Sequence, residues 1–186
     1  MKNKSKNALT FFGGLVLTSA YRLLRIFPNN DPIMGFALPI ARNQKWWQAF
    51  LFPALAMACF DVLTAKVGPW TVITAVLYGT IGVMFHFYFR KKTKVGLGTY
   101  AKLSVVGVLA FDFFTGPIMT SYLFKIPFSV ALIGQIPFTL LHLASAVTIT
   151  VLLAPVLDPS VRSLPAELKH RIKSRFFSGQ SSGVIR

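Results

Sequence analysis

Long apolar runs separated by short basic or turn-forming segments constrain this chain more than any other feature. Crossing the hydrocarbon core of a bilayer takes about 20 predominantly apolar residues in a helix. Runs of this length recur along the chain, interrupted by basic clusters such as Arg90–Lys94 and by turns such as Lys66–Pro69. Charged residues make up only 13% of the chain, whereas a soluble domain has about 25%. The sequence therefore predicts an all-α polytopic membrane protein.

One apolar segment is shorter than the others, and the distribution of positive charge decides whether it spans. Ile33–Ala41 is short and contains Pro39. If it crosses the membrane, nearly all lysines and arginines fall on the side of the N-terminus, as the positive-inside rule requires. We therefore predict six transmembrane helices in one bundle, both termini cytoplasmic, with Pro32 and Arg42–Trp47 extending the short helix across the bilayer. The six segments are Ala8–Phe27, Ile33–Ala41, Trp46–Ala65, Trp70–Phe89, Leu103–Phe124 and Phe128–Leu157.

The chain divides into a basic arm at residues 1–7, a membrane domain at 8–158 and a tail at 159–186. In the tail, apolar residues recur every fourth position between basic residues, after a possible N-cap at Ser163. This pattern predicts a basic amphipathic helix on the inner leaflet, with a lipid anchor favoured over a docking site for a cytoplasmic partner. The recurring apolar residues are Leu164, Leu168, Ile172 and Phe176.

The net charge of +15 is explained by topology, because the basic residues flank apolar spans. We therefore expect no nucleic-acid partner. We expect a multi-pass protein that is located in the cell membrane.

Polar residues inside or beside the apolar segments are the candidates for function. Ionisable groups within a membrane are costly and usually face a bundle interior or a cavity. The alternatives are that Arg22 and Arg25 extend to the interface, or that Arg25 forms a structural pair with Asp61. The candidates are Arg22, Arg25, Asn29, Asn30, Asp61, Asp112, Gln135 and His142.

Several kinds of chemistry have no support in the sequence. Neither His86 nor His142 has neighbours at metal-ligand spacing, so we expect no metal site and no cofactor. Gly96–Ala101 matches a dinucleotide-binding pattern but follows a basic cluster instead of a strand. No nucleophile–base pairing indicates an enzyme, and without a Walker A sequence any ATP-driven step must belong to a partner.

The layout resembles the substrate-binding, or S, components of energy-coupling factor (ECF) transporters, in an uncharacterised branch. The resemblance covers roughly residues 8–158. It rests on Arg25 followed by Pro28–Ile33, on Pro53–Asp61, on Phe111–Phe114, and on a closing helix with Gly134, Pro137, His142 and Pro155.

That resemblance implies a subunit that captures a vitamin or related micronutrient from outside. It also implies a membrane coupling subunit and two cytoplasmic ATPases as partners. The family's pocket opens outward under three loops, which correspond here to Pro28–Pro32, Lys66–Pro69 and Lys125–Pro127. The family often has an Ala-x-x-x-Ala coupling motif in its first helix. Here Thr10, Gly14 and Thr18 have that spacing, and such small residues also suit packing within one chain.

The leading hypothesis is thus a substrate-capture subunit of an importer. Arg22 and Arg25 would attract an anionic or acceptor-rich group, because guanidinium suits carboxylates and phosphates. Asn29, Asn30 and Asp61 would hydrogen-bond the ligand near the mouth.

Asp112, Gln135 and His142 would form the floor of that pocket. A structural or assembly protein without a small ligand is the alternative hypothesis. A stand-alone carrier with His142 and Asp112 as a proton relay is a third.

Overall fold

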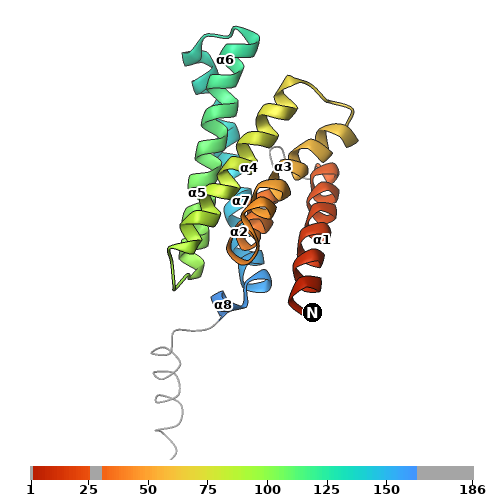
Figure 1. Ribbon diagram of the computed structural model, residues 1–186. Helices are drawn as coiled ribbons and strands as arrows, with labels where there is room; N and C mark the ends of the chain where they lie inside the picture. Colours follow the sequence, from red (N-terminus) through yellow and green to blue (C-terminus); the bar gives the residue numbers. More distant parts are fainter. Residues whose placement is uncertain (1, 26–30, 163–186) are drawn as a thin grey trace, which may run out of the picture.

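The regular elements that the structure describes are all helices. A computed structural model describes residues 2–25 and 31–162 (Figure 1). The all-α prediction is confirmed for these ranges. The elements are α1 (Lys2–Leu24), α2 (Ile33–Asn43), α3 (Trp46–Leu63), α4 (Pro69–Arg90), α5 (Leu97–Phe113), the π-helical η1 (Phe114–Ile118), α6 (Met119–Phe124), α7 (Phe128–Leu157) and α8 (Pro159–Arg162).

Four stretches of helix are long and apolar enough to cross a membrane. They are α3, α4, the continuous stretch from α5 through α6, and α7. Their outer faces leave large apolar side chains exposed, among them Val72, Val106 and Ile133. Such surfaces are costly in water but suit contact with lipid. The chain therefore has the surface of a membrane protein.

The short helix α2 lies at the centre of the bundle. Every residue from Ile33 to Ala41 is buried, and α2 contacts α1, α3, α4, α5 and α7. At a rise of about 1.5 Å per residue it is about 16 Å long, roughly half of a bilayer core. The predicted extension through Trp47 is wrong, because α2 ends at Asn43 and Trp46 already begins α3. The helix is short because it packs against protein instead of matching the bilayer.

The limits of α1 and α5 also differ from the predicted ones. Helix α1 begins at Lys2 and ends at Leu24, where Arg25 adopts a left-handed conformation with φ 44°. Helix α5 begins at Leu97, directly after the extended Gly96. Charged residues near helix ends are compatible with continued helix, so hydrophobicity alone underestimates these lengths.

Two prolines affect the last spans in different ways. Pro117 lies within η1, where the chain widens into a π-helix between α5 and α6. Pro137 lies within α7, which continues through it as one helix of 30 residues. A π-helical turn inside a helix often marks a functional site. The interruption at η1 therefore directs attention to its neighbours.

The described chain begins and ends at the same end of the bundle, where α1 starts and α8 lies (Figure 1). At this end Asp158 holds three elements together. It pairs with Arg42 Nε at 2.8 Å and accepts a hydrogen bond from Tyr100 at 2.7 Å. Asp158 thereby joins α2 and α5 to the end of α7. The predicted amphipathic helix beyond Ser163 lies outside the described residues.

The closest packing of α3 against α4 yields a test of the fold. A Cβ on Gly82 would collide with the main-chain oxygen of Ala49. We expect Gly82→Ala to destabilise the protein by about 1–3 kcal/mol, because the helices must separate. Thermal unfolding of the detergent-purified protein measures the change.

The control is Gly134→Ala, since a Cβ on Gly134 meets nothing within 4 Å. Its effect should be neutral or stabilising, because alanine favours helix over glycine. Equal melting temperatures for the two variants would contradict the close approach of α3 and α4.

Candidate functional site

A buried cluster of ionisable side chains is centred on His142 of α7. The imidazole is only 2% exposed. Its Nδ1 lies 2.8 Å from Oδ1 of Asp112 on α5. On the other side, Nε2 lies 3.5 Å from Oδ2 of Asp31 and 3.3 Å from the hydroxyl of Tyr78 on α4. Residues from three helices and from the segment before α2 thus meet in one network.

Asp31 fixes the start of α2 and joins it to the cluster. Its Oδ1 accepts a hydrogen bond from the main-chain N–H of Ile33 at 2.8 Å, which satisfies a donor at the helix start. Its Oδ2 accepts a hydrogen bond from Tyr78 at 2.9 Å, and its own N–H donates to Ser145 at 3.3 Å. The segment entering α2 is therefore held against both α4 and α7.

The charges in the cluster come close to balance. Asp31 and Asp112 face opposite nitrogens of one imidazole, so both carboxylates gain a donor when His142 is protonated. Arg22 adds a positive charge that acts on Asp31. The opposed geometry does not suit a metal ion, and within residues 2–25 and 31–162 no group of three or more His, Cys, Asp or Glu side chains is arranged to hold one.

One atom of the network has no partner. Oδ2 of Asp112 is buried and makes no hydrogen bond in the described structure. A buried acceptor without a donor costs about 1–3 kcal/mol, and more when it is charged. Asp112 also lines a cavity of about 280 Å³ between α5, η1 and α7. Asp112 therefore has one oxygen held by His142 and one buried oxygen without a partner, and its side chain lines a cavity.

The π-helical η1 shapes this cavity. Pro117 of η1 lines it, and Gly116 packs directly against the side chain of Gln135 on α7. Gln135 donates a weak hydrogen bond to Thr139 at 3.4 Å. Apart from Asp112, Gln135 and Thr139, the residues that line the cavity are apolar: Leu109, Phe113, Pro117, Leu132, Ile136, Leu140 and Leu143. The site suits a small, largely apolar molecule that brings a hydrogen-bond donor to the carboxylate.

Three predicted site residues come together, and three do not join them. Asp112 contacts His142 and shares the cavity with Gln135. Arg22, on α1, instead packs its side chain against α3. Its guanidinium lies 4.1 Å from the centre of the Phe60 ring and donates hydrogen bonds to the main-chain oxygen of Ala56 and the sulfur of Met57.

Asp61 accepts a hydrogen bond from Thr71 at 2.6 Å, and Arg25 is exposed at the end of α1. None of the ion pairs among the described residues joins Arg25 to Asp61. The suggested pair is therefore not formed, and Oδ2 of Asp61 accepts its hydrogen bond from Thr71 instead. Asn29 and Asn30 lie outside the described residues.

The small-residue stripe of α1 is used within the chain. Thr18 is fully buried, and a Cβ on Gly14 would lie 3.0 Å from the rings of Phe36 and Phe52. Thr10, nearer the start of α1, is partly exposed. At Gly14 and Thr18, the face expected to contact a coupling subunit is thus covered by α2 and α3.

Two members of the cluster were not predicted from the sequence. Neither Asp31 nor Tyr78 is among the site residues that the sequence predicts. A signal existed for Tyr78, because a tyrosine hydroxyl inside a bundle needs a partner. Asp31 had a weaker signal, since an aspartate side chain often hydrogen-bonds the main-chain N–H two residues further on.

The hydroxyl of Tyr78 provides a test of the network. Tyr78→Phe should destabilise the protein by about 1–3 kcal/mol, because Oδ2 of Asp31 loses its hydrogen bond. The matched control is Tyr88→Phe on the same helix, whose side chain is partly exposed. Thermal unfolding in detergent compares the two, and an equal effect of both substitutions would refute the network.

Comparison with known proteins does not assign the chain to a family. No family model, curated protein or solved structure compared with this chain matches it. The geometry of the cluster and its cavity is therefore the basis for a functional proposal.

Proposed function

We propose that this protein is a membrane-embedded capture subunit of an importer for a small micronutrient. The observation that carries the proposal is Asp112, which lines a cavity and has one oxygen held by His142 and one buried oxygen without a partner. Binding sites are typically apolar cavities with a few precisely placed polar groups. A ligand donor at Asp112 would complete the hydrogen bonding that the protein leaves open.

The structure changes the expected chemistry of the ligand. The anionic ligand expected from Arg22 and Arg25 has less support, since Arg22 is engaged by α3 and Arg25 is exposed. A ligand with an ammonium, amide or hydroxyl group suits the carboxylate better. The apolar walls formed by residues such as Leu109 and Leu140 suit a hydrocarbon or ring portion.

The proposal includes six membrane-crossing helices in the cell membrane with both termini cytoplasmic. The common location of α1 and α8 supports an even number of crossings. The positive-inside rule supports placing this end in the cytoplasm, since Lys45 and the cluster at Arg90–Lys94 lie in connections at that end. As the resemblance to S components implies, a coupling subunit and two ATPases would supply energy. Exposed apolar residues of α1, such as Phe12 and Val16, leave surface for such a partner.

Mass spectrometry of small molecules released from the detergent-purified protein tests the proposal. We expect one water-soluble metabolite in stoichiometric amount. Asp112→Asn should weaken its binding by roughly tenfold or more, because a charge-assisted hydrogen bond contributes about 1.5–3 kcal/mol. Asparagine keeps the shape of the side chain and a hydrogen-bonding oxygen for His142.

The control variant is Asp61→Asn, which alters a carboxylate held by Thr71 away from this cavity. It should retain the metabolite. Loss of binding in Asp61→Asn with normal binding in Asp112→Asn would show that the ligand binds near Asp61, at the mouth of the pocket predicted from the sequence, and not at Asp112. Recovery of lipid alone from every preparation would instead favour a structural or assembly protein.

A stand-alone proton-linked carrier is a second candidate. The observation in its favour is the continuous series of contacts from Asp112 through His142 and Tyr78 to Asp31. Buried carboxylate–histidine chains are typical of proton relays in membranes.

This candidate predicts uptake of the identified metabolite into liposomes without any ATPase. A pH gradient should drive that uptake, and His142→Gln should abolish the effect of the gradient. Absence of uptake by the wild-type protein alone would exclude the carrier.

A further inference from the structure

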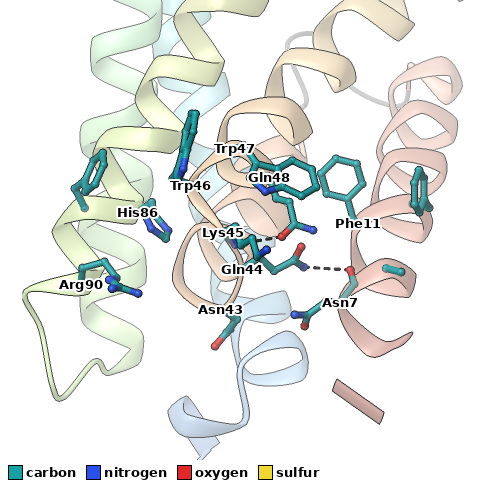
Figure 2. A pocket seen from close by; sticks show the side chains of 13 residues that line it. Asn7, Phe11, Asn43, Gln44, Lys45, Trp46, Trp47, Gln48, His86 and Arg90 are labelled. Atoms are coloured by element: carbon teal, nitrogen blue, oxygen red, sulfur yellow. Dashed lines mark hydrogen bonds between the residues drawn. The ribbon is translucent and has the colours of Figure 1, made fainter. Parts of the chain in front are cut away.

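A second and larger cavity lies at the end of the bundle where the chain begins. It has a volume of about 720 Å³ and lies between α1, the α2–α3 junction and the end of α4 (Figure 2). It is separate from the cavity at Asp112, with which it shares no residue. Its lining consists of Asn7, Ala8, Phe11, Phe12, Asn43, Gln44, Lys45, Trp46, Trp47, Gln48, His86, Phe87 and Arg90.

The cavity is positively charged. Lys45 and Arg90 border it from different elements, and no acidic residue is among its lining residues. Figure 2 shows Lys45 and Arg90 on either side of His86. Helix α3 also begins here, at Trp46, and the N-terminus of a helix attracts anions through its free N–H groups and dipole. Two side chains and one helix end therefore favour an anionic group.

Aromatic side chains form the remaining wall. Phe12 and Phe87 are 66% and 56% exposed, and Trp46 is 57% exposed. Tryptophan is enriched where a membrane meets water, because its ring is amphipathic. In a membrane-inserted bundle, these rings would place the opening at headgroup level, with apolar surface continuing toward the hydrocarbon.

Two polar groups in the wall add hydrogen-bond acceptors. Gln44 donates its amide to the main-chain oxygen of Asn7 at 3.2 Å, while its Oε1 is buried without a partner. Nδ1 of His86 lies 2.8 Å from the main-chain oxygen of Ala41, so Nδ1 carries a hydrogen and Nε2 is an acceptor in the neutral ring. Acceptors beside cations suit a headgroup that has both a phosphate and hydroxyl groups.

We propose that this cavity binds the headgroup of an anionic phospholipid from the adjacent leaflet. Lys45, Arg90 and the start of α3 bind the phosphate, and the aromatic wall contacts the first part of an acyl chain. Basic pockets at the ends of membrane helices bind anionic lipids in this way. The chain's own C-terminal tail is a poor occupant, because it is itself basic. This inference rests on membrane insertion and is independent of the ligand at Asp112.

The experiment measures phosphatidylglycerol that remains bound to the full-length protein. The protein is purified from nanodiscs of equal phosphatidylglycerol and phosphatidylcholine, and native mass spectrometry counts the bound lipids. We expect selective retention of phosphatidylglycerol. In the double variant Lys45→Gln/Arg90→Gln, retention should fall by roughly 25-fold, since each basic residue near anionic lipid contributes about fivefold.

The control is Lys91→Gln/Lys94→Gln, which removes the same charge from residues that follow Arg90 but do not line the cavity. It should retain the lipid. An equal loss in both variants would overturn the site, because attraction would then be non-specific. All four side chains are exposed, so the fold should tolerate the changes, and thermal unfolding checks this.

A competition experiment distinguishes a bound lipid from a bound soluble phosphate compound. Glycerol 3-phosphate in millimolar excess should displace little phosphatidylglycerol, since it lacks the acyl chains that contact Phe12 and Phe87. Complete displacement by glycerol 3-phosphate, or equal retention of the two phospholipids by the wild type, would overturn the proposal.

Discussion

The low polarity of the bundle interior governs how the helices of this protein are held together. A charge placed there must find a partner, because its desolvation costs several kcal/mol. His142 meets this requirement for Asp31 and Asp112 together, one on each side of its ring. Tyr78 joins the same network from α4. The positions of α4, α5, α7 and the start of α2 are therefore linked through a single imidazole.

The same constraint makes the exceptions informative. Within the described ranges few buried polar side-chain atoms are without a partner, and Oδ2 of Asp112 and Oε1 of Gln44 each belong to a residue that lines a cavity. One cavity is apolar with a carboxylate and adjoins a π-helical turn, whereas the other is basic and aromatic. Their different chemistry supports two different ligands, a small donor-bearing solute and an anionic lipid.

Much of the fold could be predicted because hydrophobic length and proline position are local properties. The spans that became α3, α4 and α7 were predicted from the lengths of the apolar runs and from the turn-forming residues between them. The length of α2 could not be predicted, since burial among five helices removes the need to match the bilayer. Similarly, Arg25 and Asp61 had compatible charges, but Thr71 satisfies Asp61 instead. Pairing depends on three-dimensional positions that spacing along the chain does not reveal.

Hydrophobic patterning is enough to predict that the chain is helical, apolar enough to span a membrane, and supplied with a few interior polar residues. It also singles out Asp112, Gln135 and His142 as candidate site residues, because polar groups in long apolar runs are rare. The contacts of Asp31 and Tyr78 within the cluster, and of Arg22 with Phe60, are visible only in the folded chain. The physical reason is that hydrophobicity is summed along a segment, whereas a hydrogen bond depends on the distance and angle between residues far apart in sequence.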